Sequence, residues 1–405
     1  MTKIRPIPVR RLWCAVFLTY LALGATLQEL PGYVGARFHG GPTAVGVAVG
    51  AAYAGTALTR PPAGWAGDAG LAQRVSFGGA ALAALGAAGQ WSAPDLPVLV
   101  ACRFLMGVGG AAVFSGSLPW VLGGAATGHR GRVTGWFGLS MWAGMSLGPL
   151  LADAVVPAGG AAPLRYLTVA LPAGAAVLIA VVRPQPAGSR SPDAGRPGGW
   201  RELVPRGVTL PGLCLGLSSY GYGMLVSLLV LYLSREHIGG EEMGLTVFSL
   251  TFLVTRAVGS PLVDRLGGVR VARVVLVIEA LGLLALGSSR SALPALASTA
   301  VTGVGLGLIY PSVSAITLQR TGSRQAGVSM GAMTSFWDLG VVVAGPVGGA
   351  TAGWLGYGPA FAVAAAVSLA AAGLTWAMAG GLMSRQFSTG GGEMSVAGEG
   401  WRSSR

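Results

Sequence analysis

Long apolar segments recur along almost the whole chain, and short polar stretches that hold most of the charged residues separate them. A helix needs about 20 apolar residues to cross the hydrocarbon core of a bilayer. The pattern therefore predicts an all-α integral membrane protein with twelve transmembrane helices. They are expected at residues 12–34, 43–61, 75–92, 96–122, 131–156, 163–182, 207–234, 243–262, 270–288, 293–318, 326–352 and 357–380.

A stretch rich in Pro, Gly, Ser and Arg interrupts the apolar pattern near the middle of the chain. Such a composition is typical of a flexible linker. The chain is thus expected to consist of a six-helix half at 1–182, a cytoplasmic linker at 183–206 and a second six-helix half at 207–380. The Ser- and Gly-rich residues 381–405 are expected to form a disordered cytoplasmic tail.

Composition and charge support a membrane location and define an orientation. Hydrophobic residues make up 52% of the chain, charged residues 10%, and the mean hydropathy is +0.64, whereas about a quarter of the residues in an average soluble protein are charged. With the N-terminus in the cytoplasm, 22 of the 27 basic residues lie on the inner side and four on the outer side. Because basic residues stay on the cytoplasmic face, both termini are expected inside.

The net charge of +13 does not indicate nucleic-acid binding, since the basic residues lie between apolar segments rather than in one patch. Only Arg103 is expected within a span. A phosphate or polyanion substrate, which would need several buried basic residues, is therefore not favoured. The Arg and Ala richness suggests a bacterial genome, and hence the bacterial inner membrane.

Other chemistry finds little support in the sequence. The three cysteines follow no metal or disulfide spacing, and no Gly-rich phosphate loop is present. The three histidines lie in predicted loops, without a nucleophile and base pair. We expect no metal, no cofactor and no enzymatic activity. A membrane enzyme and a sensor that binds without transporting are the alternatives from other classes.

An internal repeat relates the two halves at an offset of 196 residues. Arg60 corresponds to Arg256 and Asp68 to Asp264, and a Gly-Val-Gly sequence at 107–109 recurs at 303–305. Two parallel six-helix halves related by an axis along the membrane normal are a transporter architecture, with the substrate site at their interface.

Three motifs resemble those of the major facilitator superfamily. The first is RPPAGWAGD at 60–68, with its second copy RAVGSPLVDRLGG at 256–268. The second is LVACRFLMGVGGAA, which contains Arg103. The third is GWFGLSMWAGMSLGPLLADAV at 135–155, which resembles the signature of the twelve-helix drug:proton antiporters. The resemblance implies the major facilitator fold and transport by alternating access.

The resemblance assigns conformational gating to the loop motif. Asp68, Asp264 and Arg265 would latch the two halves on the cytoplasmic side by charge pairing. The first copy departs from the pattern because Ala69 replaces a basic residue. An ordinary charged turn is the alternative.

The third motif is also expected to serve gating. Ser140, Gly144, Gly148 and Ala152 are four residues apart and form one small-residue stripe on a helix, against which a neighbour can pack closely. Pro149 adds a bend. We expect a tight seam that prevents leakage, and plain close packing is the alternative.

Proton coupling is expected at Asp338, Glu29 and Arg103. Asp338 lies about 16 Å along its predicted helix, near the bilayer centre, where its charged form is disfavoured. Glu29 is the second choice because the first helix lines the cavity in the resembled fold. The resemblance gives Arg103 a part in proton movement. Structural roles for Arg103 and Asp338, through neighbouring carbonyls or hydroxyls, remain open.

Aromatic and polar residues on the expected cavity helices indicate a bulky, hydrophobic or amphipathic solute. The predicted function is proton-driven export of drugs or secondary metabolites by a monomer, that is, an efflux antiporter of the kind that confers drug resistance. A sugar or metabolite permease of the same fold is the alternative. The cavity residues are predicted to be Tyr20, Gln28, Trp142, Tyr220, Tyr222, Phe336 and Trp337.

Overall fold

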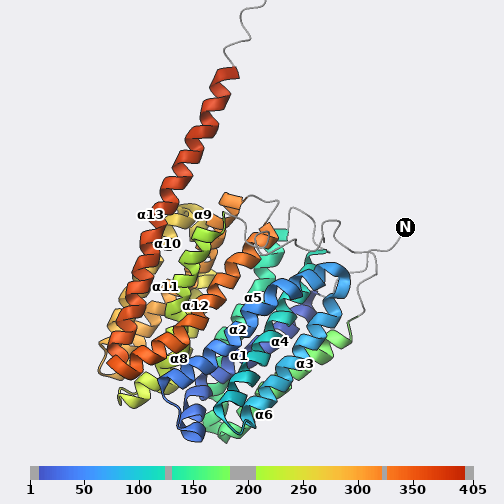
Figure 1. Ribbon diagram of the computed structural model, residues 1–405, viewed down its shortest axis with the longest axis vertical. Coiled ribbons are helices and arrows are strands. Elements are labelled where there is room, and N and C mark those ends of the chain that lie inside the picture. Colours follow the sequence, from blue (N-terminus) through green and yellow to red (C-terminus); the bar gives the residue numbers. More distant parts are fainter. Residues whose placement is uncertain (1–8, 124–129, 183–206, 322–325, 397–405) are drawn as a thin grey trace, which may run out of the picture.

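The computed structural model describes residues 9–123, 130–182, 207–321 and 326–396, and every regular element in these ranges is helical (Figure 1). The first half contains α1 (Val9–Phe38), α2 (Pro42–Ala66), the short π-helical turn η1 (Gly67–Leu71), α3 (Ala72–Trp91), α4 (Leu96–Gly123), α5 (Arg130–Gly159) and α6 (Ala161–Ala180). The second half contains α8 (Thr209–Arg235), α9 (Glu241–Leu266), α10 (Gly268–Gly287), α11 (Ala292–Thr321), α12 (Ala326–Leu355) and α13 (Tyr357–Val396).

Each of the twelve predicted segments coincides with one long α-helix. Among the described residues, nine of these helices are long and apolar enough to cross a membrane by length and composition alone. The other three are α2, α3 and α10. The first two are rich in Gly and Ala, which are only weakly apolar, and α10 carries Arg270, Arg273 and Glu279. The all-helical fold is confirmed, and the count of twelve spans is confirmed in part.

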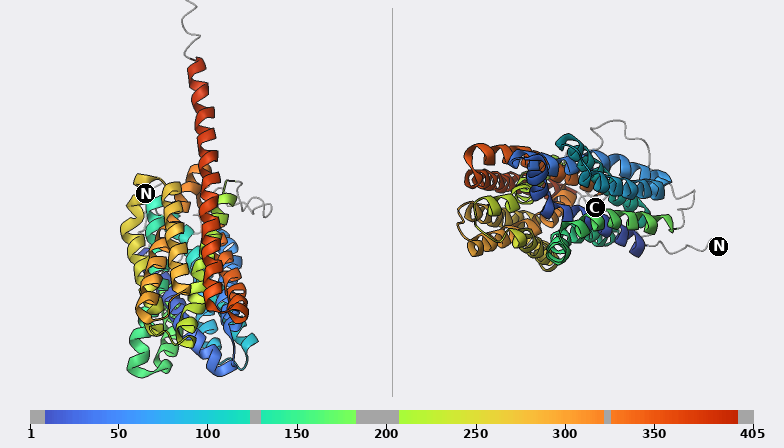
Figure 2. Two further views of the ribbon diagram at one scale, coloured as in Figure 1. Left: turned by 90° about the vertical axis from the view of Figure 1, so that its left-hand side faces the viewer. Right: turned by 90° about the horizontal axis from the view of Figure 1, so that it is seen from below.

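The two sets of helices form two bundles that lie side by side with their long axes roughly parallel (Figures 1 and 2). α1 begins and α13 continues at the same end of the molecule, which we call the termini end. The opposite end, where α1 ends and α2 begins, is the distal end. The predicted linker at 183–206 lies outside the described residues.

The glycine stripe of α5 packs against α1 within the first half. A Cβ atom at Gly144 would lie 2.6 Å from the carbonyl oxygen of Phe17, and one at Gly148 would overlap the backbone of Gly24 and Ala25. Only glycine permits this approach, and van der Waals packing of this kind drives helix association in lipid. The predicted close approach of a neighbouring helix is confirmed, and its role in gating stays a prediction.

The two halves contact each other closely at the distal end. A Cβ atom at Gly345 in α12 would overlap the backbone of Gly46 in α2. The side chain of Gln28 in α1 donates hydrogen bonds to the carbonyl oxygens of Glu241 and Glu242 at the start of α9, at 3.1 and 3.0 Å. Nearby, Thr246 of α9 donates a short hydrogen bond to Asp153 of α5. These contacts hold the halves together at this end.

Most helices extend by a few residues beyond their predicted ends, and α13 extends furthest. α2 continues to Ala66 and α9 to Leu266. Arg60 and Arg256 lie inside these helices and inside the predicted spans 43–61 and 243–262, although the charge count assigned both to the cytoplasmic side. A basic residue close to the end of an apolar segment is readily counted with the adjoining loop, whereas a charge that faces other helices can lie inside the span. α13 extends past 380 to Val396, where no proline interrupts its propagation, so residues 381–396 of the expected disordered tail are helical. Residues 397–405 lie outside the described part.

Candidate functional site

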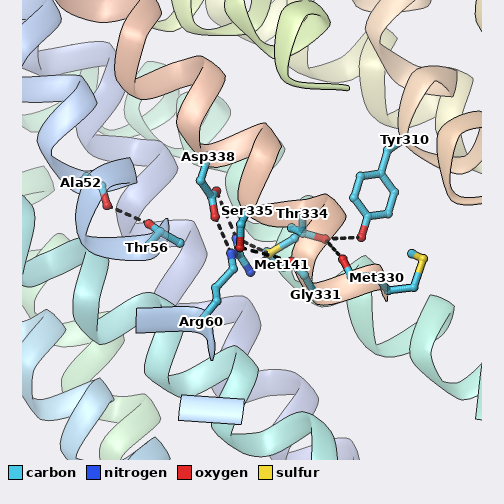
Figure 3. A network of polar contacts seen from close by, with 10 residues as sticks. All are labelled: Ala52, Thr56, Arg60, Met141, Tyr310, Met330, Gly331, Thr334, Ser335 and Asp338. Carbon is cyan, nitrogen blue, oxygen red and sulfur yellow. Dashed lines mark hydrogen bonds and ion pairs between the residues drawn. The ribbon is translucent and has the colours of Figure 1, made fainter. Parts of the chain in front are cut away.

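A buried ion pair connects the two halves. Arg60 in α2 donates from Nε to Oδ2 of Asp338 in α12 at 2.6 Å, and from Nη2 to Oδ1 at 3.4 Å (Figure 3). The two side chains are only 8% and 1% exposed. Removing charges from water is unfavourable unless they are paired with good geometry. The two-point contact provides that pairing, and 278 residues of chain separate its partners.

Among the described residues, Arg60 is the charged partner of Asp338, and the neighbouring hydroxyl groups form their hydrogen bonds elsewhere. The hydroxyl groups of Thr56 and Thr334 donate to backbone carbonyl oxygens within their own helices, each at 2.7 Å (Figure 3). Arg60 also contacts the sulfur of Met141 at 3.8 Å. A proton on Asp338 would therefore remove the principal attraction between this part of α2 and α12.

The ion pair lines a cavity to which both halves contribute. Its empty space amounts to about 550 Å³, including what is open to solvent. The charged groups in its wall are Arg60, Arg103 and Asp338. The other lining residues are Tyr20, Leu23, Leu27, Ala52, Tyr53, Thr56, Met141, Trp142, Met145, Tyr222, Thr334 and Trp337.

Arg103 in α4 reaches this cavity from the first half, where it is 1% exposed. Its Nη1 donates to the hydroxyl oxygen of Thr26 at 2.7 Å, and its Nε approaches the carbonyl oxygen of Ala48 at 3.3 Å. These acceptors are neutral, and no acidic side chain of the described residues forms an ion pair with Arg103. The predicted buried position is confirmed, whereas its part in proton movement stays a prediction.

Arg256 is a third arginine among these helices, and the sequence analysis did not place it there. Its guanidinium carbon lies 4.8 Å from the ring centroid of Trp142 and 4.9 Å from that of Tyr310. Its Nη1 is buried and has no hydrogen-bond partner among the described residues. The expectation that only Arg103 lies within a span was therefore wrong, because Arg60 lies inside α2 and Arg256 inside α9, where they face other helices. The correspondence of Arg60 with Arg256 in the repeat was the available signal.

Aromatic rings from the second half surround Trp142 of α5, which belongs to the first half. Its ring centroid lies 5.4 Å from Phe252, 5.7 Å from Tyr310 and 5.3 Å from Trp337. Tyr222 lies 5.3 Å from Trp337 in turn. A second, largely apolar cavity adjoins the first and shares Leu27, Trp142, Met145 and Tyr222 with it; its other lining residues are Ser146, Pro149, Val226, Leu245, Phe248, Ser249 and Phe252.

The predicted cavity residues divide between the cavity and other places. Tyr20, Trp142, Tyr222 and Trp337 line it. Gln28 instead joins the halves at the distal end. Phe336 packs on Gly212 and Gly216 of α8, and Tyr220 is buried in α8 with its hydroxyl unbonded in the described part; neither is among the residues that line the two cavities.

Two further carboxylates lie outside both cavities. Glu29 pairs with Arg165 of α6 at 3.4 Å, within its own half. Glu279 of α10 is fully buried and accepts hydrogen bonds from Ser218 at 2.7 Å and Ser368 at 2.8 Å. Since Glu29 already has an ion-pair partner away from the cavity, its placement gives no support to the predicted role in coupling.

The predicted latch residues lie near the termini end. Asp68 is in η1, and partial burial raises the pKa of its carboxyl group. Asp264 and Arg265 are exposed in the last turn of α9. Within the described residues neither carboxylate forms an ion pair. Residues 124–129 and 322–325, which connect helices at the same end, lie outside the described part, so the latch stays a prediction.

Comparison with known proteins identifies the family. The model of the Major Facilitator Superfamily matches residues 12–239 and 211–382. The chain belongs to the major facilitator superfamily. This superfamily consists of transporters, so the protein is a multi-pass membrane transporter for small molecules and not an enzyme.

Two relatives from bacteria span nearly the same length as this chain. The uncharacterized MFS-type transporter YhhS of Escherichia coli is 30% identical over 368 residues, which cover 89% of each chain. An uncharacterized MFS-type transporter of Burkholderia mallei is 32% identical over 371 residues, again 89% of each chain. Their names specify neither a substrate nor a coupling ion.

Two solved structures have the same fold. The human organic anion transporter MFSD10 (TETRAN) superposes with a TM-score of 0.71 at 18% identity, covering 92% of this chain and all of that one. A bacterial homolog of the human lysosomal transporter Spinster, inward-facing and unoccupied, has a TM-score of 0.75 at 12% identity, covering 91% and 96%. At these identities the likeness shows the fold alone.

Proposed function

We propose that this transporter is proton-coupled and exports hydrophobic or amphipathic small molecules across the bacterial inner membrane by alternating access. The observation that carries the proposal is the Arg60–Asp338 ion pair, which joins the two halves in the wall of the central cavity. A carboxylate inside the membrane is energetically costly, and such residues are rare and typically functional. In this superfamily member both termini are proposed to be cytoplasmic, and the active unit is proposed to be the monomer.

The ion pair couples protonation to the relative position of the halves. With Asp338 ionised, the pair ties α2 to α12. A proton on either carboxylate oxygen removes the negative charge, and Arg60 then remains as a buried cation without a counter-ion, which is strongly unfavourable. Protonation therefore favours a state in which the halves have moved and Arg60 reaches water or another anion. Protonation of Asp338 thus shifts the equilibrium between two arrangements of the halves.

The cavity chemistry supports an amphipathic solute over a sugar. The second cavity is lined mostly by aromatic and aliphatic side chains, and its hydroxyl groups are those of Ser146, Ser249 and Tyr222. A sugar site would need many directed hydrogen-bonding groups, because each unsatisfied hydroxyl is costly when buried. The distal contacts between the halves support a cavity that loads from the termini end, which is the cytoplasmic side in the proposed orientation.

Everted vesicles test the coupling. A proton gradient is established, amphipathic compounds are added, and collapse of the gradient is followed for the wild type, Asp338→Asn and Glu279→Gln. We expect substrates to collapse the gradient in the wild type and in the matched control Glu279→Gln, and to have no effect with Asp338→Asn. Continued proton movement by a folded Asp338→Asn protein would contradict the assignment of the proton site.

A further inference from the structure

We propose that Arg256 binds the negatively charged group of the transported solute, so that the substrates are amphipathic organic anions such as aromatic carboxylates. The inference rests on the proposed function for the statement that the bound solute is transported. The site itself stands on the contacts of Arg256, on the charges of the cavity and on the position of Trp142.

The described part of this site contains more positive than negative charge. Arg60, Arg103 and Arg256 supply three guanidinium groups, and Asp338 supplies the single carboxylate among the charged residues that line the cavity or stack on its aromatic wall. Asp338 already pairs with Arg60. A second negative charge is therefore favoured electrostatically, whereas a cationic solute would approach a site with a net positive charge.

The contacts of Arg256 leave it available to a ligand. The rings of Trp142 and Tyr310 attract the cation but do not neutralise it. Its Nη1 is buried and unbonded in the part of the chain that the structure describes, and a buried donor without an acceptor is unfavourable. Two of the guanidinium nitrogens of Arg60 are engaged by Asp338, and Arg103 donates to neutral acceptors.

The repeat indicates the kind of group that Arg256 would bind. Its counterpart, Arg60, holds a carboxylate through two nitrogens. The planar guanidinium group matches the two oxygens of a carboxylate, and such charge-assisted pairs are stronger than neutral hydrogen bonds. Since no acidic side chain of the described residues pairs with Arg256, a solute carboxylate would complete the equivalent interaction.

The apolar cavity accounts for the rest of the solute. Trp142 contacts Arg256 and lines both cavities, whereas Arg256 lies behind this ring and is not among the residues that line them. A carboxylate at Arg256 would therefore place the attached aromatic body against Trp142 and towards Phe252 and Leu245. Aromatic groups stack favourably on such rings. The arrangement selects a solute whose charge and apolar body are directly joined.

A binding experiment on the purified full-length protein tests the inference without a proton gradient. Isothermal titration calorimetry at pH 7 would compare three probes of the same shape: 2-naphthoate, the neutral 2-naphthamide and the cationic 2-naphthylmethylammonium. We expect 2-naphthoate to bind at least about tenfold more tightly than the amide, the effect of one charge-assisted hydrogen bond. The cation should bind most weakly.

Variants assign the selectivity to one side chain. Arg256→Gln should weaken 2-naphthoate binding at least about tenfold while changing amide binding less than about threefold. Arg256→Lys should keep part of the preference for the anion, since it retains the charge. Arg270→Gln is the matched control, because Arg270 is exposed near the start of α10 and away from both cavities. Size-exclusion chromatography verifies that each variant is folded.

Comparison of the three probes on the wild-type protein tests the proposal even if Arg256→Gln does not fold. Failure of 2-naphthoate to bind, equal binding of the anion and the amide, or unchanged anion binding in a folded Arg256→Gln protein would each overturn it. A failure of proton coupling is a separate result, because it would appear in the vesicle measurement with Asp338→Asn and leave the binding series unaltered.

Discussion

Arg60 and Arg256 occupy corresponding positions in the two halves, yet they bind different partners. Each extends from its own half to a helix of the other half. Arg60 meets the carboxylate of Asp338, and Arg256 meets the ring of Trp142. The offset of 196 residues that relates the arginines also relates Trp142 to Asp338. The same contact between halves therefore exists twice, once with a charged partner and once with an aromatic partner.

The difference shows how a duplicated architecture can separate two tasks. A carboxylate that gains or loses a proton makes the first contact sensitive to protons. An aromatic partner leaves the second guanidinium group charged and able to accept an anion. In the proposed scheme, coupling depends on Asp338 and recognition on Arg256, so each could change without removing the other.

The largest expected effect on stability comes from removing Arg60 from the Arg60–Asp338 pair while Asp338 remains. Arg60→Gln leaves Asp338 without its counter-ion and should lower the free energy of unfolding by about 3–5 kcal/mol. The double variant Arg60→Gln with Asp338→Asn should recover most of that loss. Arg256→Gln, which removes only cation–π contacts, should lower it by about 0.5–2 kcal/mol. Denaturation in detergent measures all three, and equal losses for the two arginines would contradict the comparison.

A second contrast concerns the glycines that end the corresponding motifs. Gly148 packs against α1 in its own half, whereas Gly345, which also precedes a proline and lies one residue beyond the 196-residue offset, packs against Gly46 in the other half. Gly345→Ala should therefore disfavour the state closed at the distal end by about 1–3 kcal/mol. Distances between spin labels on the distal ends of the two halves should increase. Unchanged distances would show that this contact does not limit closure.

Trp142→Asp would make the second contact resemble the first. The new carboxylate should pair with Arg256, and binding of 2-naphthoate should become at least about tenfold weaker because the anion site is then occupied. Trp142→Phe is the matched control that keeps an aromatic partner. If the Asp variant binds the anion as tightly as the Phe variant, Arg256 is not the recognition residue.

The smallest effect is expected at Glu279, a carboxylate held by hydroxyl groups instead of a guanidinium group. Glu279→Gln preserves the acceptor oxygen for one serine and should change the free energy of unfolding by less than about 1 kcal/mol, without altering proton movement in vesicles. Glu279→Leu leaves Ser218 and Ser368 without this acceptor and should lower the free energy of unfolding by more. Loss of coupling in Glu279→Gln would assign a part in proton transfer to Glu279 as well as to Asp338.

Parts of the site could be predicted from the sequence and parts could not. A carboxylate in the middle of an apolar segment is conspicuous, so Asp338 was assigned correctly to a buried position. Trp142, Tyr222 and Trp337 were likewise expected in the cavity that they line. Glu29 was the second choice for proton coupling, but in the structure it pairs with Arg165 in the same half. Which face of a helix points to the cavity depends on its rotation, which the apolar pattern defines poorly when most residues are Gly and Ala.

The sequence by itself determined the all-helical membrane architecture, the approximate bounds of twelve helices, the correspondence of the halves and the close packing at Gly144 and Gly148. These features depend on local chemistry, because backbone groups in lipid must be satisfied within a helix. Only the tertiary structure decided that Arg60 pairs with Asp338 and that Arg256 lies on Trp142 without an acidic partner in the described residues. The reason is physical: such contacts depend on the packing, rotation and depth of helices from opposite halves, which no single segment of the chain specifies.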